Sequence, residues 1–229
     1  MNPIVQKSGL SVAGLLVAGG CLAGPAATAQ AAPSATTPVG AVHTDDRAAK
    51  NDRAAKNGRV DRRAERTVRI EYQAQPNFYY CGPAATRIAL SALGRALSQD
   101  EVAKKLGTTE AGTDSALDIT RVLNELTGGG YRTTEIPDPV AKPEQVDRLR
   151  SDVVAALDRG RPVVANIKGT AVDTVGNPHS YEGGHYLTLV GYRDGGDLIR
   201  IADPAAPEGE YWMTLEKVAN WIAERGYSS

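Results

Sequence analysis

The spacing of apolar residues changes near Gly160, and this change sets the fold class. Before Gly160, apolar residues recur every three or four positions, which is typical of amphipathic helices. After Gly160, short segments rich in β-branched and aromatic residues alternate with glycine-rich turns, which is typical of strands. Helices followed by strands with tight turns predict an α+β fold in two layers, an N-terminal helical half packed on a C-terminal antiparallel sheet.

Helices are predicted at residues 82–93, 98–107, 116–126, 144–159 and 214–225. The second of these begins with Ser98 and Glu101, whose spacing is that of a capping box. Strands are predicted at residues 67–72, 162–167, 185–190 and 197–201. The glycines within residues 194–196 predict a tight hairpin connection between the last two strands.

The N-terminal segment has the composition of an export signal. Lys7 precedes an apolar run at residues 10–23, and Ala29 and Ala31 fit the small-residue pattern of a cleavage site. Residues 1–31 are therefore predicted to be a signal peptide and the protein to be secreted into the extracellular space. The alternatives are a lipoprotein anchored at Cys21 and an uncleaved membrane tether, although a membrane span needs ~20 predominantly apolar residues.

Residues 32–66 are predicted to be a disordered, charged linker. A hexapeptide at residues 46–51 is repeated without change at 52–57, and large apolar side chains are nearly absent. Residues 67–229 then form one domain, long enough to bury a single core. This domain carries 17 basic and 22 acidic residues, a net charge of −5. An acidic domain of this kind is a poor partner for nucleic acid.

Cys81 is the only cysteine that remains after cleavage at Ala31. Exported proteins usually pair their cysteines, so a lone thiol is reactive, pairs between molecules, or is a small buried apolar group. Pro83 follows two residues later, and proline in a first turn is typical of a helix N-terminus. A thiolate at that position is favoured by the helix dipole, which makes Cys81 a candidate nucleophile.

A base for this thiol must come from one of three histidines. His43 lies in the linker and His179 in a loop rich in Pro, Gly and Ser, whereas His185 begins an apolar strand. If segments 185–190 and 197–201 pair as a hairpin, Asp203 lies beside His185 and can orient its imidazole. Taken in isolation, His185 is more typical of a core or edge imidazole bonded to a backbone carbonyl, and Asp203 of a residue that begins a turn.

Gln75 lies six residues before Cys81 and offers an uncharged N–H donor. Together with the backbone N–H of Cys81, it could form an oxyanion hole for a tetrahedral intermediate.

Three segments, residues 75–85, 184–192 and 201–204, together resemble the cysteine peptidase family typified by the double-glycine leader peptidases of bacteriocin exporters, in particular its stand-alone exported members. The resemblance covers residues 70–221 and implies a papain-like fold. It implies that Cys81 is the nucleophile and His185 the general base and acid. It also implies that Asp203 orients the imidazole and that Gln75 is the oxyanion donor.

These features predict a secreted cysteine hydrolase that cleaves a peptide or other amide bond through a thioester, without metal or cofactor. The sequence contains no Cys/His cluster suited to zinc and no phosphate-binding loop of Walker type. The expected partner is a peptide or protein, cell-wall material included, with no nucleic acid and no membrane after signal cleavage. The alternatives are an inactive papain-like binding module and a transpeptidase or transglutaminase-like acyl transfer.

Overall fold

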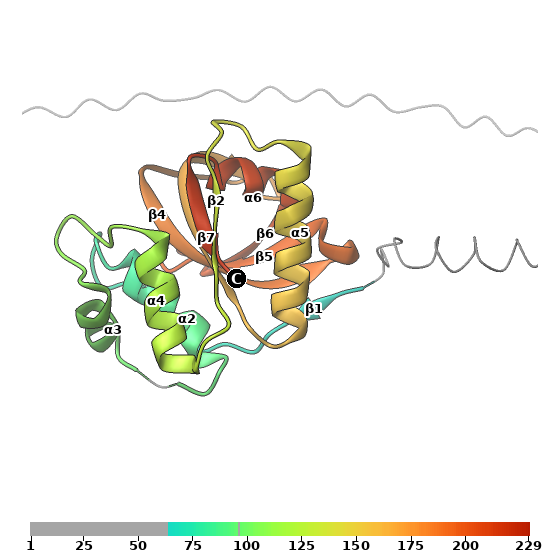
Figure 1. Ribbon diagram of the computed structural model, residues 1–229. Helices are drawn as coiled ribbons and strands as arrows, with labels where there is room; N and C mark the ends of the chain where they lie inside the picture. Colours follow the sequence, from blue (N-terminus) through green and yellow to red (C-terminus); the bar gives the residue numbers. More distant parts are fainter. Residues whose placement is uncertain (1–63, 96) are drawn as a thin grey trace, which may run out of the picture. The chain divides into compact units, whose positions relative to one another are not determined.

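The structure is a computed structural model that describes residues 64–95 and 97–229 (Figure 1). The predicted signal peptide and most of the predicted linker lie outside the described residues. Ala64 already belongs to the domain, because its carbonyl accepts a hydrogen bond from the N–H of Gly195 (3.0 Å). In the described part of the chain, no helix combines the length and apolar character needed to cross a bilayer.

An antiparallel sheet forms the centre of the domain, with strand order β2-β7-β3-β4-β5-β6 and β1 paired to β4. The strands are β1 (Arg66–Thr67), β2 (Thr133–Ile136), β3 (Val163–Val172), β4 (Pro178–Arg193), β5 (Leu198–Ala202), β6 (Glu210–Thr214) and β7 (Arg225–Ser228). The two long strands β3 and β4 lie side by side, and β4 also pairs with β5. The predicted pairing of segments 185–190 and 197–201 is therefore present, as part of the β4–β5 pair.

Helices cover both faces of this sheet: α2 (Cys81–Ser91), α3 (Gln99–Leu106), α4 (Ala116–Thr127), α5 (Pro143–Asp158) and α6 (Leu215–Ile222). Because side chains alternate along a strand, Ile167 and Leu187 pack with α5 and α6, whereas Val164 and Tyr186 pack with α2, α3 and α4. Figure 1 shows α5 apart from the group formed by α2, α3 and α4. The predicted α+β fold, with helices packed on an antiparallel sheet, is confirmed, and α5 and α6 add a second helical layer.

The predicted strand at residues 67–72 is wrong beyond its first residues. β1 ends at Thr67, and the following segment runs along α2 instead of the sheet. The N–H of Glu71 donates to the hydroxyl of Ser91 (2.9 Å), and the guanidinium of Arg87 donates to the carbonyl of Glu71 (2.7 Å). These side chains of α2 satisfy the backbone groups that a sheet partner would otherwise bond.

The prediction missed β2, β6 and β7, and it extended the last helix too far. That helix ends at Ile222 because Arg225 pairs with Ile136 of β2. The capping box of α3 is confirmed, with Ser98 and Glu101 each bonding the other's backbone N–H. The predicted turn at residues 194–196 is a short 3₁₀ turn that joins β4 to β5.

Candidate active site

Cys81 is the first residue of α2, and its side chain is buried with only 8% of the residue exposed. Gly82 allows the loop before α4 to approach this helix start, because a Cβ at position 82 would overlap the hydroxyl and Cβ of Thr113. The sulfur therefore lies at the positive end of a helix, under a loop whose position depends on a glycine.

Burial raises the pKa of the Cys81 thiol, since a buried thiolate loses its hydration. The hydrogen bond and the positive charge of His185 act in the opposite direction, together with the backbone N–H groups of Tyr186 and Gly82. The net result is a pKa below the ordinary value of a cysteine. Since the thiolate is the nucleophilic form, this environment activates Cys81.

His185 and Asp203 are joined by a hydrogen bond between Nε2 of the imidazole and Oδ1 of the carboxylate (2.7 Å). His185 lies on β4, and Asp203 follows the last residue of β5, where Thr188 pairs with Ala202. The pairing of β4 with β5 thus brings together two residues that are 18 positions apart. Because Nε2 is bonded to the carboxylate, Nδ1 is the nitrogen that remains for the Cys81 sulfur.

The imidazole of His185 is buried, and burial alone would lower its pKa. Hydrogen bonds to Asp203 and Cys81, together with their negative charges, outweigh burial and raise the pKa of His185 to about 9. At neutral pH, the site therefore favours an imidazolium, which lies between the Asp203 carboxylate and a Cys81 thiol of lowered pKa. A cation beside a thiol favours the thiolate, which is the form that can act as a nucleophile.

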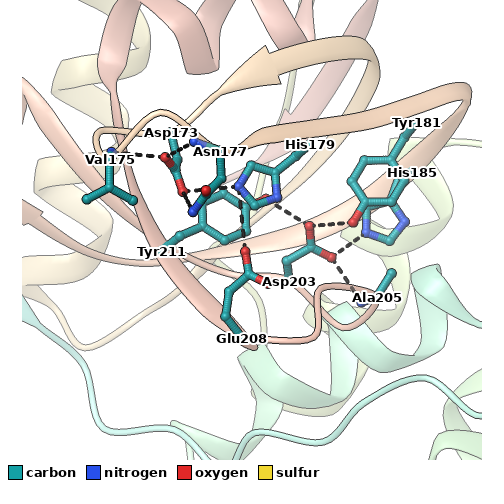
Figure 2. A network of polar contacts seen from close by, with 10 residues as sticks. All are labelled: Asp173, Val175, Asn177, His179, Tyr181, His185, Asp203, Ala205, Glu208 and Tyr211. Atoms are coloured by element: carbon teal, nitrogen blue, oxygen red, sulfur yellow. Dashed lines mark hydrogen bonds and ion pairs between the residues drawn. The ribbon is translucent and has the colours of Figure 1, made fainter. Parts of the chain in front are cut away.

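Asp203 is fully buried and is surrounded by hydrogen-bond donors (Figure 2). Besides His185, Oδ1 accepts from the N–H of Ala205 (3.0 Å), and Oδ2 accepts from the hydroxyls of Tyr181 (2.9 Å) and Tyr211 (2.8 Å). Burial raises the pKa of this carboxyl, but the interactions with His185, Ala205 and Tyr211 hold it below its usual range. Asp203 therefore remains ionised although its side chain is not exposed to solvent.

Tyr181 reaches this site through a β-bulge that the sequence analysis did not predict. Ile167 pairs with His185 and Gly169 pairs with Tyr181, so three residues of β4 face one residue of β3. Gly169 and Gly184 take φ values of +86° and +94°, which favour glycine. The bulge brings Tyr181 against His185, with ring centroids 3.9 Å apart.

Gln75 lies next to the segment that follows Asp203, because its backbone N–H donates to the carbonyl of Pro204 (2.9 Å). Its side-chain Nε2 donates to the carbonyl of Asn77 (2.7 Å), and its buried Oε1 has no hydrogen-bond partner among the described residues. An amide nitrogen carries two N–H groups, and the second is not used in the bond to Asn77. Gln75 is not among the residues that line the cleft beside Cys81, so its predicted role as an oxyanion donor stays a prediction.

Cys81 and His185 line one cleft of about 340 Å³, together with the loop at residues 111–114. Asn166 and Arg225 also line this cleft and a neighbouring hollow of about 370 Å³. The two hollows share these walls, and a groove therefore continues away from the sulfur.

His179 does not belong to this cleft. The sequence analysis placed it in a loop, but it lies buried on β4, where it pairs with Ala171. Its ring stacks on Tyr211 with centroids 3.8 Å apart, and its Nε2 lies 3.4 Å from the carboxylate of Asp173. His43 lies outside the described residues. Among the histidines that the structure describes, only His185 contacts Cys81.

Residues 67–229 match the sequence profile of the Peptidase C39-like family. No curated protein matches the chain significantly. Among solved structures, a C39-like peptidase candidate from Bacillus anthracis has a TM-score of 0.51 and 12% identity, over 72% of this chain and 96% of that chain. The peptidase domain of Streptococcus ComA, a bifunctional ABC transporter involved in quorum sensing, has a TM-score of 0.48 and 18% identity, over 70% and 96% of the two chains. A double glycine motif protease from an AMS/PCAT transporter, solved with its leader peptide, has a TM-score of 0.45 and 15% identity, over 70% and 91%.

Proposed function

Because the chain belongs to the Peptidase C39-like family, we propose that it is a secreted cysteine peptidase that cleaves a peptide or other amide bond through a thioester. In this proposal Cys81 is the nucleophile, His185 the general base and acid, and Asp203 the group that orients the imidazole. The observation that carries the proposal is the buried imidazole of His185, which is hydrogen-bonded through Nε2 to Asp203 (2.7 Å) and contacts Cys81 at the start of α2.

In the acylation step, the Cys81 thiolate attacks the carbonyl carbon and forms a C–S bond, while the carbonyl oxygen takes up the negative charge. His185 then donates the proton on Nδ1 to the leaving nitrogen, and the C–N bond breaks to release an amine and leave a thioester. In the second step, a water molecule loses a proton to His185 and attacks the thioester carbon. The C–S bond breaks, and the thiolate and the imidazolium are restored.

Stabilisation of the oxyanion falls to neutral donors in this proposal. The backbone N–H of Cys81 at the start of α2 and the free amide N–H of Gln75 are the two candidates. Such donors stabilise a charge that exists only in the transition state and the intermediate, without holding the neutral substrate equally tightly.

The groove beside the sulfur supports an extended peptide as the substrate. Its two hollows share Asp114, Asn166 and Arg225, so their walls offer charged and amide groups along its length. An extended chain advances ~3.3–3.6 Å per residue, and a groove of this kind accommodates several residues on one side of the scissile bond.

The deciding experiment treats the secreted protein with iodoacetamide at several pH values and measures intact mass. We expect alkylation of Cys81 well below pH 8, slowed in His185→Ala. A peptide library, with and without added amines, then reports turnover and separates hydrolysis from transfer to an amine. Slow alkylation with no turnover would overturn the enzyme proposal in favour of a binding module.

Export is the other part of the proposal and is supported by the apolar run at residues 10–23 and by Ala29 and Ala31. Intact mass of the protein from the culture medium is expected to show an N-terminus at Ala32. Recovery of residues 1–31 on the exported protein, or of a lipid on Cys21, would contradict release by cleavage at Ala31.

A further inference from the structure

A second cluster of ionisable side chains lies outside the active site, where Asp173, His179 and Glu208 converge (Figure 2). Each residue offers one ligand atom, and the three atoms lie within 4.8 Å of one another. Asp173 follows β3, His179 lies on β4, and Glu208 lies in the loop between β5 and β6. These residues also line one hollow of about 580 Å³. No sequence motif marks the cluster, because the fold assembles it from three separate segments.

The distances within the cluster fit the ligand atoms of a metal ion, and the one hydrogen bond that His179 makes to Asp173 is long. Nε2 of His179 lies 3.4 Å from Oδ2 of Asp173 and 3.7 Å from Oε1 of Glu208. Both separations exceed the usual N–H···O range of ~2.7–3.2 Å. Ligand atoms held at ~2.0–2.2 Å around a tetrahedral ion lie roughly 3.3–3.6 Å apart. Both distances from Nε2 are therefore close to those between ligands of one ion, and all three atoms lie within 4.8 Å of one another.

Two of the three side chains are already held in place. Oδ1 of Asp173 accepts hydrogen bonds from the N–H groups of Val175 (2.9 Å) and Asn177 (2.8 Å), which directs Oδ2 towards His179. The ring of His179 is fixed by its stack on Tyr211. Contacts of this kind orient metal ligands and tune their affinity. The side chains of Asp173 and His179 are 2% and 6% exposed, whereas that of Glu208 is 40% exposed and leaves an approach for an ion.

We propose that Asp173, His179 and Glu208 form a binding site for one divalent transition-metal ion of the Zn²⁺ type. One imidazole and two carboxylates are a ligand set that Zn²⁺ accepts, with the fourth position left to water. Ca²⁺ prefers six to eight oxygen ligands and is not expected to bind here. The ion takes the lone pair on Nε2 of His179, and the ring proton then resides on Nδ1.

The bound ion ties together three segments near Asp203. Glu208 lies in the same loop that begins with Asp203, and the ring of Tyr211 contacts His179 while its hydroxyl donates to Asp203. The ion would link this loop to β4 and to the turn after β3. This link stabilises the segments that hold the Asp203 carboxylate in place. The proposed role is structural, and it does not depend on whether the cleft at Cys81 is catalytic.

The test is calorimetric titration of Zn²⁺ into the full chain carrying Cys81→Ala, which removes the thiol as a competing ligand. We expect one Zn²⁺ per chain, a rise in the melting temperature with Zn²⁺, and no comparable response to Ca²⁺. In the same background, Glu208→Gln and His179→Gln are expected to weaken binding at least tenfold, since even supporting residues of metal sites contribute roughly 10–100-fold.

His185→Gln and His43→Gln are the matched controls, and both are expected to keep the bound Zn²⁺. Glu208 is exposed, so Glu208→Gln tests the site even if His179→Gln fails to fold. The proposal is overturned if Cys81→Ala binds no Zn²⁺, if Glu208→Gln binds Zn²⁺ as tightly as its parent, or if binding disappears in His185→Gln or His43→Gln.

Discussion

The ring of Tyr181 stacks on the imidazole of His185, with centroids 3.9 Å apart and ring planes inclined by 16°. The hydroxyl of the same tyrosine donates to Oδ2 of Asp203 (2.9 Å). One side chain therefore restrains the plane of the His185 ring and the Asp203 carboxylate bonded to it. It also covers the hydrogen bond between His185 and Asp203, which strengthens that bond by excluding water.

Two substitutions at Tyr181 separate these contributions. Tyr181→Phe keeps the stack and removes one hydrogen bond, while Asp203 retains Tyr211 and Ala205 as donors. We expect a loss of about 1–2 kcal/mol in the free energy of unfolding and a small fall in kcat. Tyr181→Ala also removes the stack and is expected to slow turnover and the alkylation of Cys81 much more. Equal kinetic effects of the two variants would show that the stack does not position His185.

Removal of the Asp203 carboxylate is expected to affect stability and activity differently. Asp203→Ala leaves the hydroxyls of Tyr181 and Tyr211 and the N–H of Ala205 without their acceptor. We expect the free energy of unfolding to fall by about 3–5 kcal/mol, measured by urea denaturation. Activity below the melting temperature is expected to fall only partly, because Asp203 orients the imidazole without reacting. Complete loss in a folded variant would contradict this role.

The sequence could predict the active-site pair but not its surroundings. Pro83 and the lone Cys81 predict a candidate nucleophile at the start of a helix. The glycines at residues 194–196 predict a hairpin, which brings the strand that begins at His185 beside the segment before Asp203. Tyr211 lies on β6, which was not recognised as a strand. The bulge that places Tyr181 depends on the pairing register between β3 and β4, which is a tertiary property.

Other features depend on contacts between distant segments. The overlap that a side chain at Gly82 would make with Thr113 cannot be inferred from either position alone. The cluster of Asp173, His179 and Glu208 likewise needs the β3–β4 hairpin and the loop after β5 to be placed in space. Local periodicity contains no information on such contacts. The helices could therefore be predicted more accurately than the residues that surround Cys81, His185 and Asp203.

The close packing at Gly82 predicts a stability effect that a compensating change can reverse. Gly82→Ala places a methyl group on the side chain of Thr113 and is expected to lower the free energy of unfolding by about 1–3 kcal/mol. Thr113→Gly in the same chain removes the obstructing atoms. The double variant is therefore expected to lose less free energy of unfolding than the two single variants lose together. Additive effects in the double-mutant cycle would show that the two positions do not collide.

Gln75 is expected to affect turnover without affecting the thiol. Gln75→Ala removes the proposed oxyanion donor, and kcat is expected to fall by roughly 10²–10³. The rate of Cys81 alkylation should stay unchanged, because no oxyanion forms in that reaction. Gln145→Ala on α5 is the matched control, since the Gln145 amide donates to Asp138 (2.8 Å) and does not line the cleft beside Cys81, so its loss should leave kcat unchanged. Slower alkylation in Gln75→Ala would point to a structural role.

The protonation of the pair formed by Cys81 and His185 predicts different pH dependences for turnover and for alkylation. The pKa of Cys81 is lowered and that of His185 is raised to about 9. Both rates should therefore rise at a pH below the ordinary cysteine pKa of ~8.5. Turnover should fall again as the pH passes about 9, because a neutral His185 has no proton for the leaving nitrogen. Alkylation needs only the thiolate and should not fall.

The same shift in His185 predicts how stability depends on pH. The folded state holds this proton up to about pH 9, whereas an unfolded histidine releases it near ~6.5. The stability that His185 contributes is fully present below the lower value and is lost as the pH rises through the upper one. Urea denaturation between pH 6 and 10 is expected to show this decline in the wild type and a flatter profile in His185→Gln. An equally steep decline in His185→Gln would mean that another group holds the proton.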